Sequence, residues 1–176
     1  MQQLKMYRPD LPVPDYTLPE GYTIRAMKPG EEVLWSVACL DAFVPSVDPI
    51  WYAKHMNRGV QTENVLLLFH GDECIGTATA QNLPDGPYLH FVAIRSAYRG
   101  RGLSRPLCLA VLKRHAELGH HGCYLTTDDF RLPAIALYLK LGFEPVLWTD
   151  DAEERWEKVY QALDDSTRPA SILCSG

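Results

Sequence analysis

The chain of 176 residues is 47% hydrophobic and 22% charged, with a formal net charge of −5, which predicts one globular domain with a substantial core. The acidic balance argues against a general nucleic-acid binder, and the five cysteines form no C-x-x-C pair, so we expect neither a nucleic-acid partner nor a metal. No signal peptide and no long apolar run is visible, and we expect a cytoplasmic protein that does not bind membranes.

The N-terminal part is predicted to begin with an extended arm. Residues 1–21 hold four prolines, which exclude a long helix and leave room for a short edge strand near residues 4–7. Alternation of apolar and polar residues predicts a strand over residues 22–27. An amphipathic helix is expected over residues 31–43 and a second, short helix over residues 48–57. The apolar residues at helical spacing in the first helix are Val33, Leu34, Val37, Ala38 and Leu40.

The middle of the chain is predicted to form a hairpin followed by a central strand. Val65–His70 and Glu73–Gln81 are apolar runs separated by a turn that contains glycine, which predicts two antiparallel strands. A Pro-Asp-Gly-Pro turn then returns the chain into a strand over Leu89–Ile94.

A turn with two glycines, Arg95–Leu103, connects this strand to a helix. Glycines allow a sharp turn and a close approach of the backbone to a ligand. The first amides of the helix have no internal partner and lie at its positive end, which suits a phosphate. A P-loop is excluded because no Lys follows a glycine, and a dinucleotide fingerprint because Arg105 stands where its third glycine belongs. The phosphate-binding candidates are Arg99, Gly100, Arg101, Gly102, Leu103 and Ser104.

Beyond this helix the chain alternates strands and helices. The expected elements are a strand over Cys123–Thr126, a helix from Pro133, a strand over Phe143–Thr149 and a last helix over Asp151–Leu163. Gly142 fits the left-handed position just past a helix end. Asp150 with Glu153 has the spacing of a capping box. The tail, residues 166–176, either supplies a further strand or none.

Two motifs resemble those of a known family. RGRGLS, Arg99–Ser104, resembles the R/Q-x-x-G-x-G/A signature of the Gcn5-related N-acetyltransferases, the GNAT family, with Ser104 in place of the usual Gly or Ala. About thirty residues later, PAIALYLKLGFEP resembles the family's A-x-x-L-Y-x-x-x-G-F. The matching residues are Ala134, Leu137, Tyr138, Gly142 and Phe143. The resemblance covers roughly Tyr22–Thr149, and Arg131 stands where the family usually has an asparagine.

The resemblance implies a fold and an activity. The fold is α/β (α+β), a mixed central sheet with helices on both faces in the order β-α-α-β-β-β-α-β-α-β. We expect one GNAT domain over residues 22–165, an arm over residues 1–21 and a tail over residues 166–176. The implied activity is transfer of an acetyl group from acetyl-CoA, the cosubstrate, directly to a primary amine without a metal. The chain is compatible with a homodimer.

The resemblance also implies roles for single residues. Backbone amides at Val92, Ala93 and Ile94 are expected to stabilise the carbonyl oxygen as it becomes negative. Arg131 is expected at a coenzyme contact. Tyr138 stands at the position of the general acid, because a phenol holds its proton at neutral pH and can give it to a thiolate. From helix periodicity alone, Tyr138 is instead an aromatic on the apolar face of a helix.

Other roles stay open between alternatives. The general base is His90 on the central strand, Glu73 on the hairpin or a water chain. The acceptor is a small amine, an amino acid, an antibiotic or a protein, because one fold hosts many acceptors. Candidates for acceptor recognition are Trp35, Phe43, Asp48, Trp51, Tyr52 and His55, of which some aromatics are expected to build the core instead. Two other functions are a non-catalytic acyl-CoA-binding sensor and a serine hydrolase at Ser104, the latter weakened by Pro106, which replaces the last glycine of G-x-S-x-G.

Overall fold

The computed structural model describes residues 2–11, 13–40, 42, 60–163 and 173–174. The chain forms a mixed α/β structure with two compact units: Leu11–His121, the larger unit, and residues 1–10 with 122–176, the smaller unit. The second predicted helix, residues 48–57, lies outside the described residues.

The larger unit is built on an antiparallel sheet in the order β2-β3-β4-β5. Its strands are β2 (Tyr22–Ala26), β3 (Val65–His70), β4 (Glu73–Leu83) and β5 (Gly86–Ile94), and its helices are α1 (Glu32–Cys39) and α3 (Ser104–Glu117). Two 3-10 turns, η1 (Thr62–Asn64) and η2 (Ser96–Tyr98), precede β3 and follow β5. The register pairs Val65 with Thr79 and His70 with Glu73, which confirms the predicted hairpin.

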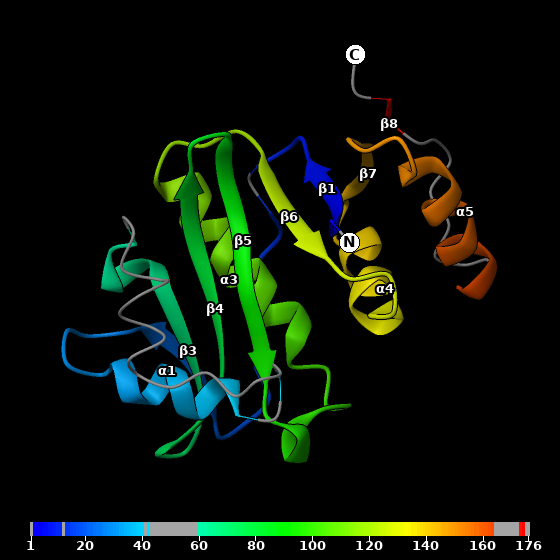
Figure 1. Ribbon diagram of the computed structural model, residues 1–176. Helices are drawn as coiled ribbons and strands as arrows, with labels where there is room; N and C mark the ends of the chain where they lie inside the picture. Colours follow the sequence, from blue (N-terminus) through cyan, green and yellow to red (C-terminus); the bar gives the residue numbers. More distant parts are fainter. Residues whose placement is uncertain (1, 12, 41, 43–59, 164–172, 175–176) are drawn as a thin grey trace. The chain divides into compact units, whose positions relative to one another are not determined.

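Helices α1 and α3 cover opposite faces of this sheet (Figure 1). Successive strand residues point to opposite faces. Leu67 of β3 therefore packs in a hydrophobic cluster with Trp35 of α1, whereas Leu66 lines a hollow together with Ala110 of α3. The larger unit thus has apolar contacts on both sides of β3.

Helix α1 is shorter than predicted, and its buried face differs from the predicted one. Trp35 and Cys39 are fully buried, whereas Val33 is 54% and Leu40 43% exposed. Trp35, Ala38 and Cys39 share one face at helical spacing, and Val33 lies off that face. Leu40 already follows the helix with extended backbone, φ −52° and ψ 138°.

The smaller unit contains a second group of strands in the order β6-β1-β7-β8. These are β6 (Cys123–Thr127), β1 (Leu4–Arg8), β7 (Glu144–Leu147) and β8 (Leu173–Cys174), and the helices are α4 (Leu132–Lys140) and α5 (Ala152–Ala162). Strand β1 is antiparallel to both neighbours, and β8 is parallel to β7. The tail therefore supplies a short strand.

Strand β1 lies in the interior of its sheet, not at an edge as the sequence predicts. It pairs with β6 through Leu4–Thr127 and with β7 through Lys5–Val146. Leu4 and Met6 are 1% and 0% exposed. Both partner strands lie more than a hundred residues away in sequence, and a five-residue alternation cannot show whether a strand is paired on one side or two.

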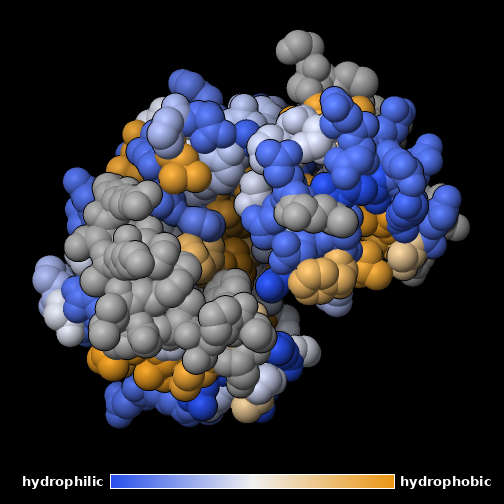
Figure 2. Space-filling model, in the orientation of Figure 1, coloured by the Kyte–Doolittle hydropathy of each residue, from blue (hydrophilic) through white to orange (hydrophobic). Residues whose placement is uncertain are grey.

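Helix α5 starts without the capping box expected from Asp150 and Glu153. Its N-cap is Asp151, with no side-chain cap, and the hydroxyl of Thr149 donates a hydrogen bond of 2.7 Å to the carboxylate of Asp151. The hydroxyl thus occupies an Asp151 oxygen that could otherwise cap the helix. Trp156 of α5 is fully buried. The surface of α5 that Figure 2 shows is mostly hydrophilic.

A neutral histidine fixes α3 to β5. His115 of α3 is fully buried, and its Nε2 donates a hydrogen bond of 3.0 Å to the carbonyl of Tyr88. Burial lowers the pKa of His115 to about 4. A protonated ring would lose its hydration in this site, so folding favours the neutral form.

We predict that this group makes the protein less stable in acid. The unfolded state binds the proton with the ordinary pKa of about 6.5, so the contribution is complete above that pH and is lost as the pH falls towards 4, by up to about 3 kcal/mol. Urea unfolding between pH 7 and 4.5 tests this against His115→Gln, whose amide can still donate to Tyr88. The variant should show a flatter pH dependence, and equal slopes in the two proteins would contradict the assignment.

Candidate functional site

Strand β5 contains a bulge at the position where the sequence predicts the oxyanion donors. Thr77 is opposite Ala93 and Thr79 is opposite His90, so one residue of β4 faces two residues of β5. One of these two, Phe91, has a left-handed φ of 48°, which is uncommon for a bulky residue. The bulge bends β5 just before the amides of Ala93 and Ile94.

Trp35 supports the bulge from the core. It makes an edge-on ring contact with Phe91 at 5.3 Å and is fully buried. Of the two alternatives that the sequence leaves open for Trp35, acceptor surface and core, the structure shows the core. The other predicted acceptor residues, Phe43, Asp48, Trp51, Tyr52 and His55, lie outside the described residues.

The turn after β5 leaves a run of backbone amides without partners. Gly100 and Gly102 have φ of 76° and 75° and have open space where a Cβ would stand. Across the described residues, no hydrogen bond is formed by the amides of residues 100–105. Helix α3 has no side-chain cap and no acidic side chain in its first turn. The positive end of α3 is thus available to an anion.

The two arginines of the turn also hold it in shape. Nε of Arg99 donates to the carbonyl of Ile94 at 2.9 Å. Arg101 donates to the hydroxyl of Tyr22 and the carbonyl of Ala97, both at 3.1 Å, and its guanidinium lies 5.0 Å from the ring centre of Tyr98. Arg101 is therefore engaged by the larger unit itself, a role that the sequence does not suggest.

The contacts of Glu73 make it a weaker candidate for the general base than its position in the sequence suggests. Its carboxylate accepts a hydrogen bond of 2.6 Å from the hydroxyl of Tyr98 and pairs with Arg95. The Tyr98 hydrogen bond is the main cause that lowers the pKa of Glu73. The carboxylate belongs to the scaffold of the turn.

His90 is in contact with Gln81, a residue that sequence reasoning missed. Nδ1 of His90 contacts the side-chain oxygen of Gln81 on β4, and burial lowers the pKa of His90 to about 4. When Nδ1 donates this hydrogen bond, Nε2 keeps a free lone pair. Gln81 is only 4% exposed, and its signal in the sequence is a long polar side chain near the end of a strand.

The second motif forms a helix and a turn in the smaller unit. Tyr138 of α4 is 8% exposed and meets the ring of Phe143 edge-on at 6.0 Å. Gly142 has a φ of 82°, which confirms its predicted place after the helix. Arg131 is the N-cap residue of α4. Each unit therefore brings together its own candidates: His90, the bulge and the glycine turn in the larger, Tyr138 and Arg131 in the smaller.

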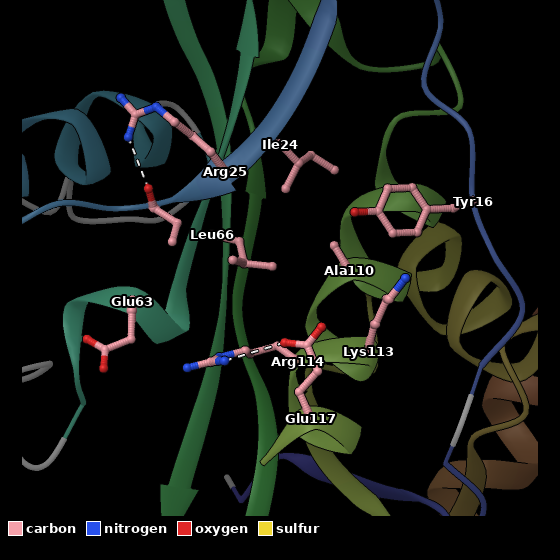
Figure 3. A pocket seen from close by; sticks show the side chains of 10 residues that line it. Tyr16, Ile24, Arg25, Glu63, Leu66, Ala110, Lys113, Arg114 and Glu117 are labelled. Atoms are coloured by element: carbon pink, nitrogen blue, oxygen red, sulfur yellow. Dashed lines mark hydrogen bonds and ion pairs between the residues drawn. The ribbon is translucent and has the colours of Figure 1, made fainter.

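A hollow of about 360 Å³ lies on the α3 side of β2 and β3 (Figure 3). Ile24 and Leu66 contribute apolar surface. Its charged Arg114 is already engaged, since it donates to Asn64 at 2.8 Å and faces Glu117 at 3.4 Å. The hollow contains none of the predicted site residues.

Comparison with known proteins decides the family. The family model for the acetyltransferase (GNAT) family matches residues 31–143. The chain belongs to the GNAT family. This confirms the resemblance of the two motifs, and it agrees with the mixed α/β structure.

Individual relatives agree with this GNAT assignment. A mycothiol acetyltransferase from Thermomonospora curvata is 30% identical over 150 residues, which cover 80% of this chain and 50% of the relative. A GCN5-related N-acetyltransferase structure from Sphaerobacter thermophilus has a TM-score of 0.70 at 26% identity, covering 82% of this chain and 49% of that one. Arabidopsis thaliana Naa50 in complex with the bisubstrate analogue CoA-Ac-MVNAL has a TM-score of 0.56 at 21% identity, covering 70% and 83%.

The GNAT chain spans about half the length, or less, of the curated relatives it matches. Among the described residues, no helix has the length and apolar character needed to cross a bilayer. The same residues contain no group of three His, Cys, Asp or Glu side chains arranged to hold a metal ion.

We predict that Gln81→Glu raises the pKa of His90 by about one unit or more, because a carboxylate beside Nδ1 favours the charged imidazole. An NMR titration of the imidazole measures this shift. Gln81→Ala is the control, since it removes the contact without adding charge and should leave the pKa low. An unchanged pKa in Gln81→Glu would show that the two side chains are not in contact.

Proposed function

We propose that the chain is an acetyl-CoA-dependent N-acetyltransferase that moves the acetyl group directly to a primary amine. The observation that carries this proposal is the run of amides without partners over residues 100–105, in the segment that connects the bulged strand β5 to α3. Membership of the GNAT family supports the same reading.

The residues present fit the phosphates of the coenzyme. A backbone with free N–H groups, open space at Gly100 and Gly102 and the positive end of a helix together suit an anionic group. Arg99, Arg101, Leu103 and Ser104 would complete this binding segment. For Arg131 we keep the coenzyme contact that its place in the family motif implies. Bound acetyl-CoA supplies the acetyl group as a thioester.

The proposed catalytic groups meet three chemical demands. His90 accepts a proton from the amine at Nε2, so that the nitrogen can bond to the carbonyl carbon. Amides at Val92–Ile94 donate to the carbonyl oxygen while its negative charge develops. Tyr138 gives its proton to the sulfur as the carbon–sulfur bond breaks. The low pKa of His90 keeps it neutral at neutral pH, although it also makes the imidazole a weaker base.

The acceptor is proposed only as an amine. Several curated relatives bear the name mycothiol acetyltransferase, so amines related to mycothiol come first in a panel that also includes amino acids and peptide N-termini. Binding of acetyl-CoA without release of thiol to any amine would favour the non-catalytic sensor.

We predict that acetyl-CoA raises the melting temperature of the protein and that Gly102→Ala reduces this rise. A ligand at about a hundred times its Kd stabilises the folded state by roughly 2.7 kcal/mol. The added methyl group would project into the open side of the turn. Differential scanning fluorimetry with and without acetyl-CoA measures both effects.

Gly119→Ala is the matched control for this experiment. Gly119 also has a positive φ, 83°, with open space at its Cβ position, but it follows the C-terminal end of α3. Both variants should lose about 1 kcal/mol of stability from backbone strain, and only Gly102→Ala should show a reduced response to acetyl-CoA. Equal responses in both would remove the glycine turn from the coenzyme site.

We further predict that Tyr138→Phe lowers kcat about tenfold or more and leaves the Kd for acetyl-CoA unchanged, because only the proton donor is lost. Thiol release in the presence of an accepted amine measures kcat. Tyr160→Phe, on α5, is the control and should behave as wild type. Unchanged turnover in Tyr138→Phe would remove this residue from the mechanism.

A further inference from the structure

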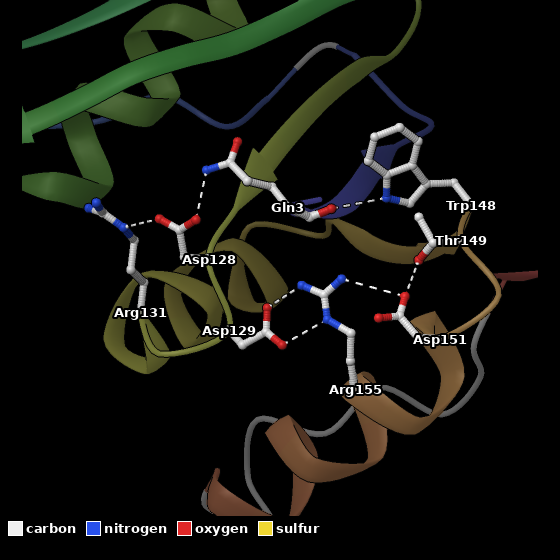
Figure 4. A network of polar contacts seen from close by, with 8 residues as sticks. All are labelled: Gln3, Asp128, Asp129, Arg131, Trp148, Thr149, Asp151 and Arg155. Atoms are coloured by element: carbon white, nitrogen blue, oxygen red, sulfur yellow. Dashed lines mark hydrogen bonds and ion pairs between the residues drawn. The ribbon is translucent and has the colours of Figure 1, made fainter. Parts of the chain in front are cut away.

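A polar network surrounds the turn that begins helix α4 in the smaller unit (Figure 4). Two neighbouring aspartates, Asp128 and Asp129, lie between β6 and α4 and point to different partners. One aspartate organises the start of α4, and the other ties it to α5.

Asp128 fixes Arg131. Its carboxylate accepts from Nε of Arg131 at 2.9 Å and from the side-chain amide of Gln3 at 3.0 Å. The backbone follows the same arrangement, since the amide of Arg131 donates to the Asp128 carbonyl at 3.0 Å and the amide of Ile135 donates to the Arg131 carbonyl at 3.0 Å. Any movement of this turn therefore moves both the Arg131 side chain and the first turn of α4.

Asp129 holds the turn to α5 through Arg155. Nε and Nη2 of Arg155 donate to the two carboxylate oxygens at 2.9 and 2.5 Å, a bidentate geometry that fixes orientation as well as distance. The Arg155 hydrogen bonds are the main cause that lowers the pKa of Asp129. Asp151 lies 3.7 Å away on the other side of the guanidinium.

Arg155 is unusual in its burial. It is 8% exposed, and no other Arg, Lys, Asp or Glu of the described residues is buried to this degree. A buried charge is held where a partner is fixed in place, and loss of the partner leaves it uncompensated. The ion pair therefore constrains both α5 and the turn.

The two side chains that bind the aspartates from other elements, Gln3 and Arg155, lie outside the part of the chain that the family model matches. Gln3 precedes β1 and Arg155 is on α5, whereas the match covers residues 31–143. The Asp128–Arg131 turn lies inside the match. Segments at the two ends of this chain thus hold a turn within the family domain.

We propose that Arg155, through its ion pair with Asp129, is a positioning residue that keeps Arg131, at the start of α4, in the geometry needed to bind acetyl-CoA. This inference rests on the proposed function, because it takes Arg131 as a coenzyme contact. It assigns to α5 a role in coenzyme affinity besides its role in the core.

The test measures the Kd for acetyl-CoA by calorimetry, at a temperature where circular dichroism shows every variant folded. Arg155→Met should weaken binding about tenfold, a change of 1.4 kcal/mol. Arg155→Lys keeps the charge but loses the bidentate hydrogen bonds, and Asp129→Asn keeps a hydrogen-bond acceptor. Both should therefore weaken acetyl-CoA binding less than Arg155→Met does. They replace Arg155→Met in the test if that variant does not fold. Lys158→Met is the matched control, because it breaks an exposed ion pair with Glu154 on the same helix and should leave the Kd unchanged.

A double variant separates positioning from general destabilisation. If Arg155 acts through Arg131, Arg131→Met should weaken binding, and Arg131→Met with Arg155→Met should be no weaker than Arg131→Met alone. The inference would be overturned if the two substitutions weakened binding by factors that multiply in the double variant. A folded Arg155→Met protein with the wild-type Kd for acetyl-CoA would overturn it as well. A wild-type protein that binds no acetyl-CoA would instead overturn the proposed function, and the inference with it.

Discussion

Backbone amides without partners impose the constraint on which the candidate site depends. An unpaired N–H requires an acceptor, and the turn over residues 100–105 presents a run of them at the positive end of α3. The turn keeps this shape because Gly100 and Gly102 adopt positive φ and because Arg99 and Arg101 are bonded back to the larger unit. The carboxylate of Glu73 also holds the turn, because it accepts a hydrogen bond from Tyr98 and pairs with Arg95.

Three polar side chains that are buried or half-buried each join two elements of the fold. His90 joins β5 to Gln81 of β4, His115 joins α3 to the backbone of β5, and Arg155 joins α5 to the turn before α4. A buried polar group without a partner is costly, so each pair restricts how its two elements can move. In the larger unit this restriction falls on the bulged strand, and in the smaller unit on the helix that carries Tyr138.

The ends of the chain complete the smaller unit. Strand β1 lies between β6 and β7, and α5 packs the fully buried Trp156. Both elements lie outside residues 31–143, the part that defines the family. They supply core, strand pairing and the partners of the Asp128–Asp129 turn, so the GNAT motif residues of this unit are supported by segments that carry no family signature.

The sequence by itself determined the family motifs, the hairpin, the glycine turn and the position of Gly142, because these depend on local spacing and on backbone conformations that glycine adopts easily. Only the tertiary structure decided that β1 has two partner strands, that Trp35 is core, that Arg101 is bonded to Tyr22 and that Gln81 contacts His90. Most of these contacts join residues far apart in the chain, whereas Gln81 and His90 meet across the β4–β5 pair. Strand register and side-chain packing determine these contacts, and local sequence patterns show neither of the two.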